Sequence, residues 1–400
     1  MKCETVKLGE YLYIKGRIGW KGLKKNEYLD NSEYRIINGE TLTVDGIDWS
    51  KAGYITEERY MESPEIMLQE NDILISKDGT IGKIGYVDKL DMPTTVASGI
   101  FVIRNEKPEI IDTKFIYHFL RSPYFKAFIE MRTEGSVIPH LYQKDFVDLD
   151  FPLYPLEIQQ KISSILNVLD EKIALNKEIN NNLEQQGAAL FKKMFIDENN
   201  NNWKYGTLAN LGTVVGGSTP SKAKEEYYTN NGIAWITPKD LSGNHSKFIS
   251  HGANDITELG LKNSSASIMP RGTVLFSSRA PIGYIAIAKN DVTTNQGFKS
   301  VIPNVNIGTA YIYYLLKHSI PALESVAIGS TFKEVSGAIM KNFEVIIPDQ
   351  EKLTTFNSFC ETLFYQQEML EQENQYLENL RNVLLPQLLS GKVDCSNVTI

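Results

Sequence analysis

The sequence contains one arrangement of segments twice. Residues Asn71–Gly82 (NDILISKDGTIG) align with Gly272–Gly283 (GTVLFSSRAPIG), and in both a short apolar strand leads through a polar turn to Ile-Gly. Further along, Gly135–His140 corresponds to Gly329–Glu334, and each is followed by a strand that ends near a proline and by a long helical pattern. Because an internal repeat determines the architecture of a chain, we expect the order head, helix, head, helix.

Both helical patterns are long and amphipathic. The first is predicted from about residue 156 to 195 and the second from about 352 to 385, where Pro386 and Gly391 mark its end. Apolar residues recur with the spacing of a coiled coil, and the expected interface residues are Ile158, Ile162, Ile165, Leu169, Ile179, Leu183, Leu363, Leu370, Leu377 and Leu384. Such helices would be about 50 to 60 Å long at 1.5 Å per residue. Neither head could bury that length, so we expect the helices to pair as an antiparallel coiled coil.

Four polar residues interrupt the apolar pattern of the two helices: Lys172, Asn176, Gln366 and Glu373. Polar residues in a coiled-coil interface can fix register or partner choice at some cost in stability. The alternative is that they face solvent in an imperfect coil. Both interpretations remain open at this stage.

The repeat divides the chain into five parts. Residues 1–152 form head one, 153–196 the first spacer helix, 197–202 a polar linker, 203–348 head two, and 349–400 the second spacer helix with a tail. Short strand patterns separated by Gly, Asp and Asn turns, with short helices among them, predict mixed structure in each head. The predicted fold class is therefore α+β: two globular mixed α/β heads and two long paired helices, related by a pseudo-twofold repeat.

Composition excludes several classes of protein. The 400 residues are 42% hydrophobic and 22% charged, as in soluble globular proteins. No apolar run reaches the roughly 20 residues that span a bilayer, and the first residues do not resemble an export signal, so we expect a cytoplasmic protein without a membrane partner. Cys3, Cys360 and Cys395 are far apart in the sequence, which predicts neither a disulfide framework nor a zinc site.

The charge is unevenly distributed along the chain. The net charge of −8 opposes nucleic-acid binding at first sight, because phosphate contacts need clustered Lys and Arg. Residues 203–345 nevertheless carry about +4, and residues 1–25 have an excess of about five positive charges. Local basic surfaces on both heads are therefore compatible with DNA binding.

Several segments, in order and largely doubled, carry a family resemblance. They are Gly16–Leu23, Thr56–Tyr60, Lys77–Lys83 and Gly135–Leu141 in head one, Gly216–Ser221, Trp235–Leu241 and Gly329–Glu334 in head two, Pro155–Gln159 and Pro348–Glu351 before the helices, and Leu384–Gly391 after the second helix. This set resembles the specificity subunits of type I restriction-modification systems over nearly the whole chain. Pro348–Glu351 lacks the Leu of the family's Pro-Leu-Glu-x-Gln pattern, which affects only the expected start of that helix.

The resemblance implies a function in DNA recognition. Each head would be a target-recognition domain that reads one half of a bipartite double-stranded DNA target, and the helices would set the spacer between the halves. Because the heads differ in sequence, the half-sites should differ. The family also implies two modification (methyltransferase) subunits and restriction (translocase and nuclease) subunits as partners. S-adenosylmethionine, ATP and Mg are expected in those partner subunits, and no cofactor is expected in this chain.

Sequence motifs for catalysis are missing from the chain. It has no Pro-Pro pair, and an adenine methyltransferase would be expected to carry an Asn-Pro-Pro-aromatic motif. It has no GxxxxGK[ST] phosphate loop, and its five histidines show no metal-ligand spacing. Pro348-Asp349 with Glu351-Lys352 resembles part of a nuclease motif but is better explained as a helix start with acidic residues in the first turn. We therefore expect a non-catalytic subunit without a metal site.

The candidate DNA-contacting residues are basic and hydroxyl side chains in predicted turns. Such side chains can bond base edges or phosphates, and the candidates are Lys15, Arg17, Lys21, Lys24, Lys25 and Lys77 in head one, and Ser218, Thr219, Lys222, Lys224, Lys239, Arg279 and Lys333 in head two. Lys77 and Arg279 are favoured because they sit at nearly matched positions of the repeat. For each candidate the alternative is an ordinary solvated side chain. Trp20 and Trp235 could stack on DNA or belong to the core.

Two other functions remain as alternatives. A coiled-coil adaptor with two binding heads and no DNA partner would assemble with little dependence on salt, whereas DNA binding through phosphates weakens steeply as salt rises. An acidic DNA mimic would fit the net charge, but it predicts evenly acidic surfaces, and residues 203–345 are locally basic.

Overall fold

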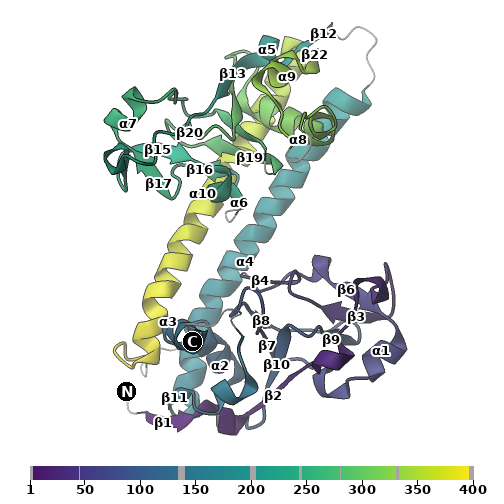
Figure 1. The fold of residues 1–400 in the computed structure, drawn as a ribbon, viewed down its shortest axis with the longest axis vertical. Helices are drawn as coiled ribbons and strands as arrows, with labels where there is room; N and C mark the ends of the chain where they lie inside the picture. Colours follow the sequence, from purple (N-terminus) through teal and green to yellow (C-terminus); the bar gives the residue numbers. More distant parts are fainter. Residues whose placement is uncertain are drawn as a thin grey trace. The chain divides into compact units, whose positions relative to one another are not determined.

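The computed structural model describes residues 3–44, 46–133, 140–198, 204–242, 246–279, 281–329 and 333–395. These residues form two compact units (Figure 1): unit 1 is Met1–Lys172 with Tyr376–Ile400, and unit 2 is Ile173–Gln375. Each unit contains one head together with a part of each long helix. The expected order of head, helix, head and helix along the chain is confirmed.

The two long helices are α4 (Leu156–Lys192), which ends in a π-helical turn (Lys193–Asp197), and α10 (Gln350–Leu389). The prediction that the second helix ends before Pro386 is wrong, because α10 continues past this proline. A proline in the last turn removes a helical hydrogen bond. Leu388 and Leu389 lie beyond it and are buried in the core of unit 1, and this burial stabilises the last turn.

Head one is built on a four-stranded antiparallel sheet in the order β2-β10-β7-β8. A three-stranded sheet has the order β6-β3-β9, and two further pairs are β1-β11 and β4-β5. The strands are β1 (Glu4–Lys7), β2 (Leu12–Gly16), β3 (Tyr34–Ile37), β4 (Leu42–Thr43), β5 (Gly46–Ile47), β6 (Gly53–Ile55), β7 (Ile73–Ser76), β8 (Ile84–Tyr86), β9 (Thr94–Val96), β10 (Ile100–Asn105) and β11 (Asp150–Leu153). The α-helices are α1 (Glu57–Met61), α2 (Thr113–Leu120) and α3 (Pro123–Thr133).

Head two repeats this plan with small additions. Its main sheet has the order β13-β21-β18-β19-β16, its second sheet β14-β17-β15-β20, and its terminal pair is β12-β22. The strands are β12 (Lys204–Thr207), β13 (Gly212–Gly216), β14 (Tyr228–Thr229), β15 (Ile233–Ile236), β16 (Phe248–Ile249), β17 (Asn254–Ile256), β18 (Val274–Ser278), β19 (Ile282–Ala288), β20 (Thr293–Thr294), β21 (Lys299–Pro303) and β22 (Glu344–Ile347). The helices are α5 (Leu208–Leu211), α6 (Pro238–Ser242), α7 (Glu258–Lys262), α8 (Thr309–Ser325) and α9 (Gly337–Asn342).

The repeat seen in the sequence holds at the level of single hydrogen bonds. Ser76 Oγ donates to the Thr80 carbonyl at 2.6 Å and accepts from the Lys83 amide at 2.9 Å. Ser277 Oγ donates to the Pro281 carbonyl at 2.9 Å and accepts from the Tyr284 amide at 2.7 Å. The glycines that end the two turns, Gly82 and Gly283, both have positive φ, 85° and 97°, a conformation that favours glycine. The aligned segments therefore form the same turn in both heads.

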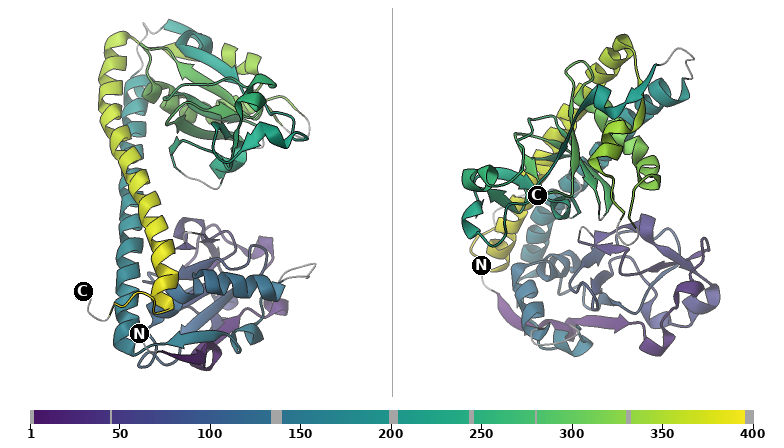
Figure 2. Two further views of the ribbon diagram at one scale, coloured as in Figure 1. Left: turned by 90° about the vertical axis from the view of Figure 1, so that its left-hand side faces the viewer. Right: turned by 45° about the horizontal axis from the view of Figure 1, so that its top comes forward.

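Each hydrophobic core contains one end of both long helices. In unit 1, Ile162 and Leu166 near the start of α4 and Leu385 near the end of α10 pack with the aromatic residues of head one. In unit 2, Phe191 near the end of α4 and Phe356 near the start of α10 pack with head two. The helix pair therefore runs antiparallel within each unit, as predicted, and both views of Figure 2 show the two helices side by side through unit 2.

Most of the predicted coiled-coil residues lie at the helix interface or against a core. Ile162, Leu183 and Leu363 are buried, Ile158, Ile165 and Leu384 pack partly buried against the core of unit 1, and Leu169, Leu370 and Leu377 are partly buried. The prediction is wrong for Ile179, which is 37% exposed. The amphipathic pattern placed Ile179 in the interface between the two helices, but the buried positions nearest to it on α4 are Asn176 and Leu183.

The buried polar residues of the helix interface are not all those that the sequence predicted. Asn176 is buried as the coiled-coil interpretation predicted, but Gln366 is exposed and its neighbour Gln367 is buried instead. The Gln367 side chain donates to the Asn180 carbonyl at 3.1 Å and accepts from Lys247 of head two at 2.6 Å. The face of α10 that turns inward is thus determined by its contacts with both α4 and head two.

Candidate nucleic-acid interface

In each head the loops that carry most candidate DNA contacts leave the main sheet at one edge. In head one, Gly16 at the end of β2 lies opposite Phe101, and Ser76 at the end of β7 lies opposite Ile100. In head two, Gly216 at the end of β13 lies opposite Lys299, and the Ser278 amide at the end of β18 donates to the Gly297 carbonyl at 2.7 Å. The turns that follow these positions are therefore neighbours in space. They contain Arg17, Lys21, Lys24 and Lys77 in head one, and Ser218, Thr219, Lys222, Lys224 and Arg279 in head two.

Arg17 is a structural residue rather than a DNA contact. Only 1% of it is exposed, its Nε donates to the Val96 carbonyl at 3.0 Å, and its terminal nitrogens lie 3.4 and 3.5 Å from the hydroxyls of Ser63 and Thr95. Burial lowers the pKa of its guanidinium. The prediction for Arg17 is corrected, because its side chain holds the end of β2 against β9 inside the head.

Lys77 anchors its turn through its backbone. Its amide donates to the Gly99 carbonyl at 2.9 Å and its carbonyl accepts from the Leu141 amide at 3.1 Å. The side chain is half-buried, with Nζ 4.7 Å from the centre of the Phe101 ring, and burial lowers the pKa of the amine. The loops around residues 77, 99 and 141 are thereby held together at the sheet edge.

The other candidates of head one occupy varied positions. Lys24 is exposed, and Lys21 Nζ donates to the Glu62 carbonyl at 2.6 Å. Lys15 lies within β2 opposite Val102, with Nζ 5.8 Å from the Tyr13 ring. The side chains of Lys25 and Trp20, and most of the Gly135–His140 segment, lie outside the described residues.

In head two a row of polar side chains crosses the sheet edge. Arg279 Nη1 lies 3.8 Å from a Glu334 carboxylate oxygen, and Lys299 Nζ lies 3.4 Å from the other oxygen. Lys299 Nζ is also 3.5 Å from the Gln296 carbonyl, and the Gln296 side chain contacts the Thr219 hydroxyl. The row therefore joins four chain segments, around residues 219, 279, 296–299 and 334.

The remaining candidates of head two surround this row. Ser218 donates its amide to the Thr294 carbonyl at 2.8 Å, and its carbonyl accepts from Trp235 Nε1 at 3.0 Å. Trp235 is 6% exposed, so it belongs to the core rather than to a DNA-stacking surface. Lys239 is exposed on α6. This helix follows β15, and the carbonyl of Ile236 at the end of β15 accepts a hydrogen bond from the Asn295 amide. The lysines at 222, 224 and 333 are also exposed.

Head two is attached to the long helices by a buried ionic cluster. The carboxylate of Glu184 on α4 contacts the amines of Lys247 and Lys317 and, at 3.3 Å each, the hydroxyls of Tyr313 and Tyr314. Burial alone would raise the pKa of Glu184, but the two lysines outweigh it and hold the pKa below its ordinary value. All four partners belong to head two, so one carboxylate joins the head to α4.

Glu371 on α10 makes a second attachment to the same loop of head two. Its carboxylate accepts from the backbone amides of Lys247 and Phe248 at 2.7 and 3.2 Å. Burial raises the pKa of Glu371 to about 7. The loop before β16 is thus held by α4 through Glu184 and by α10 through Glu371.

Head one has its own ionic attachment to the helix segments of unit 1. Asp170 on α4 contacts Arg121 of α2, and Arg381 of α10 donates to it at 2.6 Å. Burial alone would raise the pKa of Asp170, but the two arginines hold it below its ordinary value. Nearby, His118 Nε2 donates to Asn167 Oδ1 at 2.9 Å, and burial lowers the pKa of His118 to about 4.

Comparison with known proteins explains this paired architecture. Residues 2–185 and 200–379 each match the family described as "Type I restriction modification DNA specificity domain". The chain belongs to this family. The expected identity as a type I specificity subunit, with two target-recognition heads, is confirmed.

Named relatives support the same assignment. The type I restriction enzyme MjaIX specificity subunit of Methanocaldococcus jannaschii is 40% identical over 195 residues, which is 48% of this chain but only 44% of that relative's length. The HindI specificity subunit of Haemophilus influenzae is 24% identical over 407 residues, covering 82% of this chain and 87% of its own. The crystal structure of an S subunit from M. genitalium has the same fold, with a TM-score of 0.58 at 17% identity over 97% of this chain and 96% of that one.

The candidate residues did not include several polar side chains at the sheet edge that carries the candidate DNA contacts in each head, here called the recognition edge. Asp78, His140, Gln296, Lys299 and Glu334 all take part in contacts there. The candidates predicted from the sequence were basic and hydroxyl side chains, because phosphate binding needs them. Acidic and amide groups also read base edges. The repeat alone could have indicated Asp78, because it aligns with the candidate Arg279 in the matched turn.

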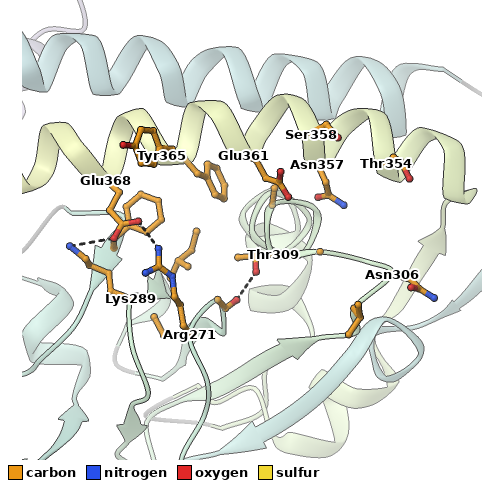
Figure 3. Close-up of a pocket in the computed structure, with 18 of the residues that line it drawn as sticks. Arg271, Lys289, Asn306, Thr309, Thr354, Asn357, Ser358, Glu361, Tyr365 and Glu368 are labelled. Atoms are coloured by element: carbon orange, nitrogen blue, oxygen red, sulfur yellow. Dashed lines mark hydrogen bonds and ion pairs between the residues drawn. The ribbon is translucent and has the colours of Figure 1, made fainter.

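A cavity of about 490 Å³ lies elsewhere in unit 2 of the specificity subunit, between head two and α10 (Figure 3). Arg271 and Lys289 of the head both pair with Glu368 of α10, at 3.0 and 3.6 Å, and Thr309 Oγ1 donates to the Gly272 carbonyl at 2.8 Å. Gly272 precedes β18, whereas the recognition turn follows the end of that strand. The cavity therefore belongs to the attachment of the head and not to the recognition edge.

Within the described ranges, no group of three or more His, Cys, Asp or Glu side chains is arranged to hold a metal ion. No helix in the part of the chain that the structure describes is long and apolar enough to cross a membrane.

Proposed function

We propose that this specificity subunit reads an asymmetric bipartite DNA target, one half with each head. The observation that carries the proposal is the pair of matched sheet edges: the turns have the same backbone hydrogen bonds in both heads but present different side chains. DNA sequence is read by side chains at base edges, while other contacts position the protein on phosphates. Two different half-sites require different side chains on the same backbone framework, and the two heads have this arrangement.

The two long helices would set the spacer between the half-sites and dock the modification subunits. Large apolar side chains remain exposed along both helices, namely Val168, Leu175 and Ile179 of α4 and Phe359, Tyr365, Met369, Tyr376 and Val383 of α10. Large apolar side chains left exposed together are typical of a protein interaction site. We expect two modification subunits to bind these helices.

The chemistry of the assembly would reside in the partner subunits. In our proposal this chain has no catalytic role, the modification subunits use S-adenosylmethionine to methylate adenine, and restriction subunits use ATP and Mg for translocation and cleavage. Such an enzyme acts on DNA inside the cell, so we propose a cytoplasmic location.

The test is reconstitution with the modification partner. The purified chain alone should show no methyltransferase, ATPase or nuclease activity, and adenine methylation at one bipartite motif should appear when the modification subunit is added. Binding of the complex to that motif should weaken steeply between about 50 and 200 mM salt. Methylation by the chain alone would contradict the proposal. Salt-independent assembly without any DNA binding would instead support the coiled-coil adaptor.

A further inference from the structure

Each head carries a pair of contacting polar side chains, one of them a carboxylate, at the same backbone position of its recognition edge. Lys77 and Ser278 are matched, because the Lys77 amide bonds Gly99 at 2.9 Å and the Ser278 amide bonds Gly297 at 2.7 Å. Their carbonyls also accept matched amides, from Leu141 at 3.1 Å and from Val335 at 2.9 Å. The residues just after Lys77 and Ser278 therefore face the residues just before Leu141 and Val335 across two loops.

These facing residues form pairs of opposite polarity in the two heads. In head one, Asp78 follows Lys77 and its carboxylate contacts Nδ1 of His140. In head two, Arg279 follows Ser278 and lies 3.8 Å from the carboxylate of Glu334. The carboxylate belongs to Asp78, in the turn after β7, in head one, and to Glu334, in the facing loop, in head two. Identical scaffolds thus present a carboxylate in one head where they present a guanidinium in the other.

Neither pair is needed to hold its loops together. The backbone hydrogen bonds of Lys77 and Ser278 already join the same loops. All four side chains are between 28% and 45% exposed, and polar pairs of that exposure contribute little to stability. Their polar atoms are therefore free to exchange an internal partner for a DNA base without loss of the fold.

The other basic candidates fit a base-reading role less well. Arg17 is buried and fully engaged, and Lys77 is half-buried against Phe101. Lys222 and Lys333 are exposed lysines. A lysine acts on phosphate mainly as a point charge, whereas the planar fork of arginine matches the two acceptors of guanine.

We propose that these matched pairs are specificity-determining contacts: Arg279 donates to O6 and N7 of a guanine in the half-site of head two, and Asp78 accepts from the N4 amino group of a cytosine in the half-site of head one. In the free protein, Glu334 and His140 hold these side chains in place until the base replaces them. The inference rests on the proposed function, and it adds which side chain reads which base.

The experiment maps methylated motifs in cells that carry the modification partner with each variant. Arg279→Ala should relax one guanine position in one half-site, with discrimination reduced by about fivefold or more, and leave the other half-site and the spacer unchanged. Asp78→Asn should relax one cytosine position in the other half-site. A good base contact contributes about 1 to 3 kcal/mol of discrimination, or roughly 5- to 150-fold. Lys262→Ala, on exposed α7 outside the recognition edge, serves as the matched charge-removal control.

A gain-of-function exchange makes the test independent of simple damage. The double variant Asp78→Arg, His140→Glu gives head one the pair of head two, and it should create a guanine preference at the relaxed position. Where a folded variant complex no longer methylates, competition binding between the original target and the singly substituted target gives the same ratio. Unchanged discrimination in Arg279→Ala and Asp78→Asn, or a change in both half-sites from one substitution, overturns the inference. A wild-type complex that methylates no bipartite motif would instead overturn the proposed function.

Discussion

Asn176 of α4 donates its side-chain amide to Oδ1 of Asn374 of α10 at 2.9 Å, inside the helix interface of unit 2. Asn176 is fully buried and Asn374 is 7% exposed. Asn176 also donates to Glu373 at 2.7 Å, and Asn374 donates to the Ile173 carbonyl at 3.4 Å. Sliding one helix along the other would leave these buried groups without partners, so the pair favours a single register.

The first prediction concerns this pair. Asn176→Ala should lower the stability of the chain by about 1 to 3 kcal/mol, because it leaves a buried carbonyl oxygen without its donor. Replacing both Asn176 and Asn374 by Leu should restore or exceed the stability of the wild type. Urea unfolding followed by circular dichroism measures both, with exposed Asn182→Ala as the control. A double variant that is weaker than the single variant would contradict this account.

The second prediction concerns the attachment of head two. Glu184→Ala should destabilise unit 2 by about 3 kcal/mol or more, because it leaves Lys247 charged and buried. Adding Lys247→Met should recover much of that loss. Lys317→Ala removes a partner whose side chain is 42% exposed, so its effect should stay below about 1 kcal/mol. Thermal unfolding of the three variants tests this order, and equal losses for Lys317→Ala and Glu184→Ala would refute it.

The third prediction is a pH dependence caused by His118. Burial lowers its pKa from 6.5 to about 4, so between these values the unfolded chain binds more protons than the folded chain. Its contribution to stability is therefore complete above about pH 6.5 and is lost as the pH falls toward 4, by up to about 3 kcal/mol.

His118→Gln should remove this part of the pH dependence. The measurement is the urea midpoint of wild type and variant at several pH values between 4 and 7.5. His318→Gln replaces an exposed histidine and should leave the wild-type curve unchanged. Parallel curves for wild type and His118→Gln would show that the buried imidazole does not titrate as described.

The fourth prediction tests whether the heads are modular. Replacing residues 203–345 with another head of the family should change one half-site and leave the other half-site and the spacer intact. The replaced segment comprises nearly all of head two, while Glu184 and Glu371 remain on the helices to receive it. Motif mapping by methylome sequencing gives the result. If both half-sites changed together, the heads would not act separately.

The fifth prediction tests whether helix length sets the spacer. Deleting residues 171–177 from α4 and 372–378 from α10 shortens each helix by about 10 Å while keeping the apolar pattern in phase. The deletion spares Asp170 and Arg381 in unit 1, and Glu184 and Glu371 in unit 2, so the attachments of both heads are kept.

The preferred DNA spacer should then shrink by up to about three base pairs, since B-DNA rises about 3.4 Å per pair, provided that the changed helical phase is tolerated. Deleting only residues 372–374 is the unmatched control, and it should misalign the interface and weaken assembly. An active seven-residue variant that keeps the original spacer would show that the helices serve as a docking surface only.

Much of this protein followed from its sequence alone. The aligned segments around Ser76 and Ser277, and the two runs of heptad-spaced apolar residues, were enough for the two heads and the paired helices, and the larger set of family-like segments indicated the family. These are local patterns, and a turn or an amphipathic helix depends mainly on residues that are close together in the chain. For the same reason the predicted ends of the elements were nearly correct, apart from the passage of α10 through Pro386.

The tertiary structure decided which residues face inward and which side chains meet. Arg17 carries the same charge as its neighbours in the sequence, yet the hydroxyls and carbonyl that bind it come from the distant Ser63, Thr95 and Val96. Gln367 rather than Gln366 is buried because Lys247 of head two reaches it. Asp78 and Arg279 gained their partners, His140 and Glu334, from loops that only the sheet brings close. Burial and charge pairing depend on residues that are far apart in the chain, and their identity does not appear in any local pattern.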